Sequence, residues 1–202
     1  IVSMTTKSAE ITKLLISSYV AYKINFANMV GELLTNNGLY DEIKLVTDTL
    51  SGHNVIGKSN FNYGHSFGGP YLPSENRVLG EFCNKNNLEF ILPYVTEDFN
   101  TQHSSFIKKY YVKINDDKQP FIVDGLGYKD TSTDTTESPK LNLVYDLLKD
   151  GFTVYILESK EFIKDSKLVK ELYNDFGNNI KFFVQGTTPK GIYISFWYFF
   201  LN

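Results

Sequence analysis

The longest helical pattern in this chain runs from Ser8 to Asn37, and it constrains the fold more than any other segment. Ser8 can cap its start, and Gly38 provides a stop. Apolar residues recur at the three- and four-residue spacing of one helix face: Ile11, Leu14, Leu15, Tyr19, Tyr22, Phe26, Met29, Val30, Leu33 and Leu34. A second apolar set lies on the other side: Val20, Ala21, Ile24 and Ala27. A helix that is apolar on two sides belongs inside a domain or against a second copy of the chain.

The rest of the first half also favours helices. A short helix is expected at 39–50, followed by a loop rich in Gly, Asn and Ser that ends at Gly69. Pro73 sits near the first turn of a helix that continues to about Asn86, and a further helix is expected over 92–114. The polar segment 115–120 then predicts a boundary, with a helical domain at 1–115 and a second domain at 120–202.

After this boundary, strands alternate with helices. Strands are expected at 121–123, 152–157 and 180–184, and the apolar run 192–201 is predicted to be a buried strand. Helices are expected from Ser138-Pro139 to Gly151 and over 167–176. This order predicts an α/β fold with a parallel sheet, whose ligand sites lie outside the carboxyl ends of the strands.

Composition excludes several classes of function. The net charge is −3 and no basic stripe is present, which argues against a nucleic-acid partner. The run at 192–201 is too short to cross a membrane as a helix, so no membrane association is expected. The single cysteine, Cys83, excludes an internal disulfide and fits the cytoplasm or another reducing compartment. The three histidines are far apart in sequence, so no metal site is predicted.

Three segments, in order, carry a resemblance to a known family. They are 8–13 with 21–26 (SAEITK and AYKINF), 67–77 (FGGPYLPSENR) and 125–139 (GLGYKDTSTDTTESP). The set resembles the UDP-glucose/GDP-mannose dehydrogenases. Members of that family have an NAD-binding Rossmann domain, a central helical dimerisation domain and a C-terminal Rossmann-like domain that binds the nucleotide sugar. The resemblance therefore implies a homodimer through helix 8–37 and a Rossmann-like second domain.

The resemblance also implies roles for individual residues. Lys13 matches the lysine that stabilises negative charge on the substrate, and Glu75 stands where the family has an active-site aspartate. Nucleotide-sugar contacts are implied for residues on both predicted domains: Phe67, Gly68, Gly69, Tyr128 and Lys129. Structural explanations compete with these roles, because the two glycines could serve the turn alone and Lys129 could be a solvated lysine.

Other positions depart from the family pattern. The family oxidises a sugar alcohol to a carboxylate through a cysteine nucleophile, and here Tyr71 takes that place. A phenol with an ordinary pKa of about 10 is a poor nucleophile and leaving group compared with a thiolate. Ser17 replaces the asparagine that orients water, and Thr136 replaces the arginine that contacts the NAD phosphates. No GxGxxG fingerprint is present, so NAD, the family's cofactor, is expected not to bind this chain alone.

Three interpretations remain open. The first is an inactive dehydrogenase homologue that retains some nucleotide-sugar binding. The second is the C-terminal part of an NAD-dependent nucleotide-sugar 6-dehydrogenase whose NAD domain is not in this chain. The third is a structural or assembly protein that reuses the fold, for which the long two-sided helix supplies an apolar surface.

Overall fold

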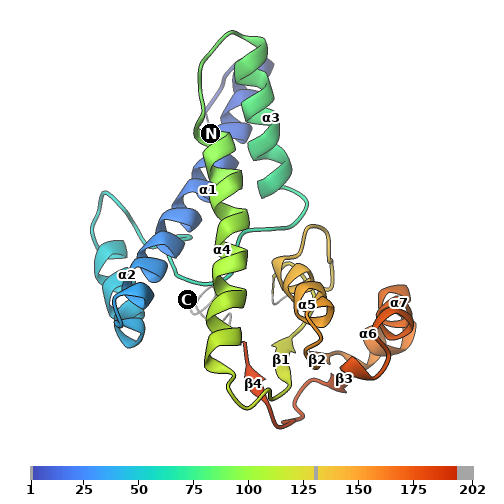
Figure 1. The fold of residues 1–202 in the computed structure, drawn as a ribbon. Helices are drawn as coiled ribbons and strands as arrows, with labels where there is room; N and C mark the ends of the chain where they lie inside the picture. Colours follow the sequence, from blue (N-terminus) through green and yellow to red (C-terminus); the bar gives the residue numbers. More distant parts are fainter. Residues whose placement is uncertain (1, 130–131, 195–202) are drawn as a thin grey trace. The chain divides into compact units, whose positions relative to one another are not determined.

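The computed structural model describes residues 2–129 and 132–194 (Figure 1). The chain divides into two compact units, and the boundary between them falls within a helix, between residues 103 and 104. The domain limits given above, 1–115 and 120–202, stay a prediction. The α/β class is confirmed: helices make up the first unit, and a parallel sheet with helices makes up the second.

The first unit is built from helices. These are α1 (Thr6–Asn36), the 3-10 turn η1 (Tyr40–Glu42), α2 (Ile43–Ser51), α3 (Leu72–Lys85) and the first half of α4 (Leu92–Ile114). The predicted cap of α1 was wrong: Thr5 is the cap, and its Oγ1 accepts a hydrogen bond of 3.2 Å from the Ser8 amide. Pro73 lies in the first turn of α3, as expected for a residue without an amide hydrogen.

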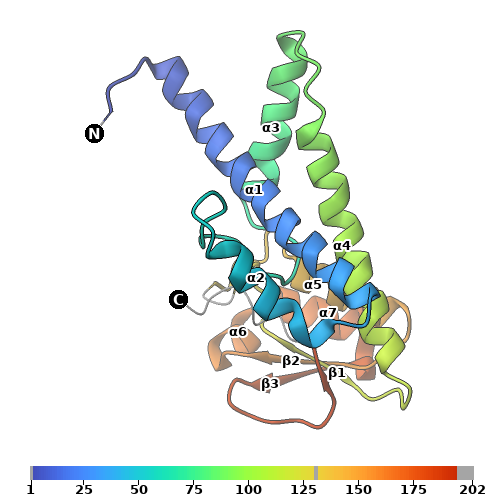
Figure 2. The same cartoon turned by 90° about the vertical axis from the view of Figure 1, so that its left-hand side faces the viewer.

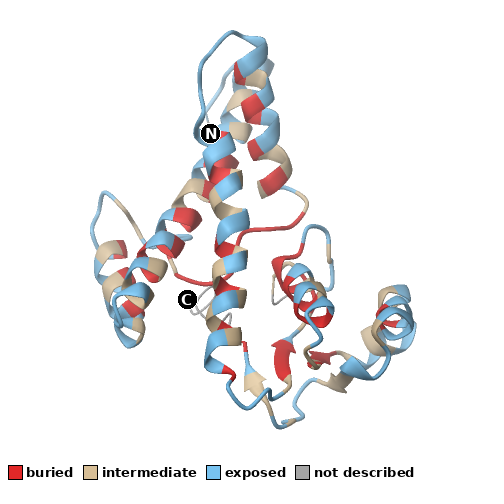
Figure 3. Ribbon diagram, in the orientation of Figure 1, coloured by how far each residue is buried: buried red, intermediate tan, exposed pale blue. Residues whose placement is uncertain are grey.

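The two apolar sides of α1 have different environments. Its second half buries small and β-branched side chains, among them Ala21, Ile24, Ala27 and Val30, and α1 lies beside α3 (Figure 2). A stripe on the outer side stays exposed in the single chain: Leu15, Tyr19, Phe26, Met29 and Leu33. Bands of buried and exposed residues therefore alternate along α1 (Figure 3).

The loop between α2 and α3 has no helix or strand, yet much of it is buried. Phe61 and Phe67 are only 2 % and 4 % exposed. A buried loop needs partners for its backbone, and side chains of α1 and α4 provide them. Asn28 Oδ1 accepts from the Gly64 amide at 3.0 Å, and its Nδ2 donates to the His65 carbonyl at 3.2 Å. Asn100 accepts from the Phe67 amide at 2.8 Å and donates to the Phe67 carbonyl at 2.9 Å.

The second unit contains a four-stranded parallel sheet in the order β3-β2-β1-β4. The strands are β1 (Phe121–Asp124), β2 (Val154–Glu158), β3 (Ile180–Val184) and β4 (Ile192–Tyr193). The helices are α5 (Pro139–Lys149), α6 (Lys160–Asp165) and α7 (Lys167–Phe176), followed by the 3-10 turn η2 (Gly177–Asn179), and α5, α6 and α7 lie on one side of the sheet (Figure 2). Helix α6 was not predicted. The predicted strand 192–201 begins as expected at β4, but residues 195–202 lie outside the described ranges.

The sheet order fixes where a ligand site belongs. The chain builds β1, β2 and β3 in one direction and then returns to place β4 on the other side of β1, so the direction of winding reverses at β1. In open parallel sheets ligands bind at the carboxyl ends of the strands beside such a reversal. Among the described residues, no helix is both long and apolar enough to cross a membrane.

Candidate functional site

The first unit brings together the four residues assigned above to the catalytic part of the site. Lys13 on α1 donates to both carboxylate oxygens of Glu75 on α3, at 2.8 and 2.7 Å, and to Ser17 Oγ at 3.2 Å. Ser17 lies one turn after Lys13, which places both side chains on the same face of α1. Residues 62 positions apart in sequence thus form one polar cluster.

Glu75 is the charged centre of this cluster. Burial disfavours its ionised form, but hydrogen bonds from Lys13 and Ser17 and the positive charge of Lys13 outweigh this effect and lower the pKa of Glu75. The Lys13 side chain is 62 % exposed and that of Glu75 is 17 % exposed. The pair therefore lies at the surface, and the carboxylate already neutralises the ammonium group that the family uses to stabilise substrate charge.

Tyr71 stands at the edge of this cluster. Its ring centroid is 5.8 Å from Lys13 Nζ, and 65 % of the residue is exposed. It is the residue directly before α3, and its carbonyl accepts a hydrogen bond from the Glu75 amide at 2.8 Å. The structure therefore groups a cationic amine, a hydroxyl, a carboxylate and a phenol, without a thiol among these four residues. Lys13 and Tyr71 are exposed, and Ser17 is buried.

The remaining residues of the glycine segment serve the fold of the first unit. Phe67 packs in a core cluster with Ala21 and Ile24, so its ring is part of the hydrophobic core. Gly68 and Gly69 are buried, and Gly69 has a φ of +87°, a conformation that side chains with a Cβ rarely adopt. Cys83 on α3 is 6 % exposed, which fits the small buried side chain that its position predicts.

The other predicted contacts lie in the second unit, in the loop that follows β1. The Tyr128 amide donates to the Asp134 carbonyl at 2.9 Å, and Lys129 Nζ lies 5.4 Å from the Tyr128 ring centroid. Thr136 is exposed, and its amide donates to Asp134 Oδ1 at 2.8 Å. Hydrogen bonds from Thr136 lower the pKa of Asp134.

Ser138 caps α5, and its Oγ accepts from the Leu141 amide at 3.3 Å. It lies directly before the first turn, where a capping side chain can reach the free amides. Asp134 closes a turn within the loop.

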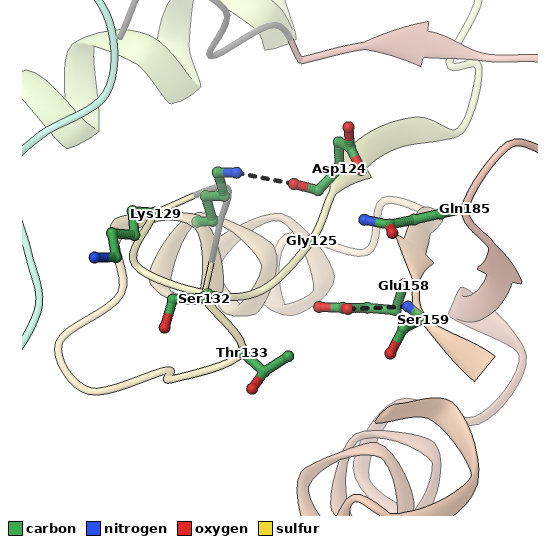
Figure 4. A pocket seen from close by; sticks show the side chains of 10 residues that line it. Asp124, Gly125, Lys129, Ser132, Thr133, Glu158, Ser159 and Gln185 are labelled. Atoms are coloured by element: carbon green, nitrogen blue, oxygen red, sulfur yellow. Dashed lines mark hydrogen bonds between the residues drawn. The ribbon is translucent and has the colours of Figure 1, made fainter. Parts of the chain in front are cut away.

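A cavity of about 260 Å³ lies at the carboxyl ends of β1, β2 and β3 (Figure 4). Its walls are polar, and they come from the ends of β1 and β2, the loops that follow β1, β2 and β3, and the first turn of α5: Asp124, Gly125, Gly127, Lys129, Ser132, Thr133, Lys140, Glu158, Ser159 and Gln185. Gly127 has no substitute here, because a Cβ at this position would collide with the Ser132 carbonyl oxygen. Of the residues predicted to contact a nucleotide sugar, Lys129 lines this cavity.

Two buried charged residues shape the cavity, and neither was predicted from the sequence. Glu158 is 4 % exposed, and its carboxylate accepts from the Leu126 amide at 2.8 Å and the Ser159 amide at 3.3 Å. Burial raises the pKa of Glu158 more than these amides and the charge of Lys140 lower it. Lys140 is 2 % exposed, and its Nζ donates to the Asp124 carbonyl at 2.9 Å.

The sequence offered a partial signal for these two residues. Glu158 directly follows the predicted apolar strand 152–157 and is the last residue of β2, where a side chain reaches the ligand edge of a parallel sheet. Lys140 carried no signal, because a lysine in the first turn of a helix is usually solvated. Among residues 2–129 and 132–194, no group of histidine, cysteine and acidic side chains could hold a metal ion.

Comparison with known proteins gives a family match for part of the sequence and a fold match for the structure. Residues 7–102 match the model of the UDP-glucose/GDP-mannose dehydrogenase family, central domain. The structure resembles that of a UDP-glucose dehydrogenase from the hyperthermophilic archaeon Pyrobaculum islandicum, with a TM-score of 0.70 and 22 % identity over 89 % of this chain and 40 % of that protein. It also resembles a UDP-D-ManNAc dehydrogenase from Pyrococcus horikoshii, with a TM-score of 0.58 and 18 % identity over 92 % of this chain and 51 % of that one.

These likenesses have defined limits. At such identities the two structures show a shared fold, and the chain spans about half of their length or less. No match was found among curated protein sequences. The family model covers α1, α2, α3 and the start of α4, the part that carries the Lys13–Glu75 cluster. Residues 7–102 of this chain are therefore a central domain of the UDP-glucose/GDP-mannose dehydrogenase family.

Proposed function

We propose that this chain is a homologue of the nucleotide-sugar dehydrogenases that binds a nucleotide sugar and does not oxidise it. The observation that carries the proposal is the position of Tyr71. The residue at the nucleophile position is a largely exposed phenol, and the nearby Lys13 is already paired with Glu75 through both carboxylate oxygens. A thioester cannot form on a phenol, and the thiol of Cys83 is buried in α3.

The residues at the expected cofactor position do not fit the phosphates of NAD. A dinucleotide phosphate needs a cation or a set of free amides, and Thr136 is neutral, with its amide donating to Asp134. Asp134 and Glu137 flank it and add negative charge. We therefore assign no hydride-transfer step to this chain.

Nucleotide-sugar binding has support in the second unit. The polar cavity lies at the sheet edge where ligands of parallel α/β folds bind, and Lys129 lines it. Hydroxyl groups of Ser132, Thr133 and Ser159 and the amide of Gln185 offer hydrogen bonds to a polyhydroxylated ligand (Figure 4). Lys129 supplies a positive charge suited to a diphosphate.

The first experiment is calorimetric titration of the chain with UDP-glucose, with UDP and GDP-mannose for comparison. Saturable, base-selective binding that is lost in Lys129→Ala supports the proposal. Lys170→Ala is the matched control, because Lys170 is an exposed lysine on α7 and its loss removes the same charge from the same unit. Absence of heat and of a thermal shift at millimolar ligand would contradict it.

A structural role is the second candidate, and the exposed stripe of α1 favours it. Leu15, Tyr19, Phe26, Met29 and Leu33 follow the seven-residue spacing of helices that pair, and they are 42–61 % exposed in the single chain. We propose that this stripe forms the interface of a homodimer. Sedimentation of the wild type and of Tyr19→Asp/Leu33→Asp tests it, with a dimer expected for the first and a monomer for the second. Assemblies larger than a dimer, without ligand binding, would favour the structural role over nucleotide-sugar binding.

The remaining interpretation is that this chain forms part of an NAD-dependent dehydrogenase. It is supported by the span of the chain, which covers 40 % of the Pyrobaculum islandicum enzyme. NADH formation from UDP-glucose by a longer polypeptide that contains this chain, with Tyr71 unchanged, would favour that interpretation and would contradict the proposed lack of oxidation.

A further inference from the structure

A buried histidine connects three segments of the first unit, and none of the functions above uses it. His103 on α4 is 0 % exposed. Its Nδ1 lies 2.6 Å from Glu32 Oε1 on α1, and its Nε2 lies 2.7 Å from the carbonyl oxygen of Gly64, in the loop before the glycine segment. The ring also stacks on Phe99, with ring centroids 6.1 Å apart, and meets the edge of Tyr63 at 5.8 Å.

The two partners of the ring set its protonation. A carbonyl oxygen can only accept a hydrogen bond, so Nε2 must carry a hydrogen. An ionised carboxylate can also only accept, so Nδ1 must carry one as well when Glu32 is charged. A neutral imidazole has a hydrogen on only one nitrogen and cannot satisfy both partners. The Glu32 side chain is 20 % exposed, so its carboxylate stays in partial contact with solvent.

We propose that His103 is a doubly protonated imidazolium that bridges Glu32 and Gly64, and that this charged bridge positions the loop carrying residues 67–69. His103 is a positioning residue, because the ring acts on the Gly64 backbone and not on a ligand. The inference holds whether or not a nucleotide sugar binds.

The surroundings of the ring support a fixed charge. Among the ring contacts given above, Glu32 from α1 and Tyr63 from the loop are titratable, while Phe99 from its own helix adds no charge. His65, next to Gly64, directs its own Nδ1 to the Ser66 carbonyl at 2.6 Å. Among these contacts, Glu32 supplies the carboxylate that the imidazolium requires.

The bridge bears on the glycine segment through the backbone. Gly64 lies between the Asn28 and His103 contacts, and Phe67 follows three residues later with both backbone groups bonded to Asn100. The charge-assisted bond is the strongest type among these attachments. Loss of the charge should therefore increase local opening of this loop more than local opening of the helices.

The test is the nitrogen NMR spectrum of protein labelled with ¹⁵N-histidine, recorded at pH 7.5. One of the three histidines should show both ring nitrogens protonated, and His53→Gln and His65→Gln leave this signal in place and so assign it to His103. Glu32→Gln keeps the shape and can donate its amide hydrogen to Nδ1. The ring should then become neutral, with one nitrogen signal moving to the unprotonated range.

Hydrogen exchange supplies the second readout. The Gly64 and Phe67 amides should exchange about tenfold faster in Glu32→Gln than in the wild type, because a neutral bond replaces a charge-assisted one. Glu10→Gln removes the same charge from an exposed site on the same helix and should leave both rates unchanged. A neutral His103 in the wild type, or unchanged loop exchange in Glu32→Gln, would overturn the proposal. If Glu32→Gln does not fold, the wild-type spectrum alone decides the protonation.

Discussion

Each unit of this protein holds a glutamate and a lysine at its candidate site, and the two pairs are built in opposite ways. Glu75 and Lys13 are in direct contact at the surface, where the lysine is 62 % exposed. Glu158 and Lys140 are both buried, and each bonds to backbone groups of the loops around the cavity. The first carboxylate is stabilised as an anion, and the second is pushed toward its neutral form. The Glu75 pair is therefore accessible to a ligand, whereas the Glu158 pair is part of the fold.

The largest difference should appear when each carboxylate is removed. Glu158→Ala leaves the buried Leu126 and Ser159 amides without their acceptor, so the second unit should lose about 2–4 kcal/mol of stability. Glu75→Ala removes a surface pair and should cost less than about 1 kcal/mol. Urea unfolding followed by hydrogen-exchange mass spectrometry measures the stability of each unit separately. Equal losses in the two variants would show that the distinction between the pairs is mistaken.

The pH dependence of stability should have opposite signs in the two units. The raised pKa of Glu158 means that its folded state binds a proton more readily than its unfolded state, so stability is present at low pH and falls as pH rises from about 4.3. The lowered pKa of Glu75 gives stability above that range, and it is lost as pH falls below it. Unfolding measured from pH 3 to 8 checks both slopes.

Amide variants separate the two contributions. Glu158→Gln should flatten the slope above about pH 4.3 in the second unit, and Glu75→Gln should flatten the slope below it in the first. The Glu75 effect should be the smaller one, because solvent screens its partner. Persistence of either slope in its own amide variant would assign that slope to another group.

The smallest expected effect is at Tyr71. Tyr71→Cys should change stability by no more than about 0.5 kcal/mol, because the side chain is 65 % exposed. It should also produce no NADH from UDP-glucose and NAD, because Thr136 and its acidic neighbours do not suit the cofactor phosphates. Measurable NADH production from this variant would show that the chain binds NAD and would contradict the role given to Thr136 and its acidic neighbours.

Much of the fold could be predicted from the sequence, because it depends on local patterns. The apolar spacing of α1, Pro73 at the start of α3 and Ser138 at the start of α5 placed these helices close to their observed bounds. Helix α6 was missed because six residues are too few for a periodic pattern, although Ser159, whose Oγ accepts from the Phe162 amide, is a recognisable cap.

The candidate sites were predictable only in part. Lys13, Ser17, Tyr71 and Glu75 were identified through the family resemblance, and the structure adds that they lie together. The side chains that hold the loop could not be predicted, because Asn28, Asn100 and His103 meet it across 33–39 positions of sequence, and Glu32 meets His103 across 71. No spacing rule connects residues so far apart. Lys140 was missed for the related reason that its burial follows from the tertiary fold.

The attachment of the glycine loop has a consequence for how such a protein can diverge. The path of residues 64–67 is held by Asn28, Asn100 and His103, which lie outside the segment itself. A lineage could therefore exchange the residue at position 71 and abandon a chemistry while it inherits the same backbone. Shape and reactivity are encoded at separate positions here. A chain of this kind can thus keep the fold of its ancestors after selection for the reaction has ended.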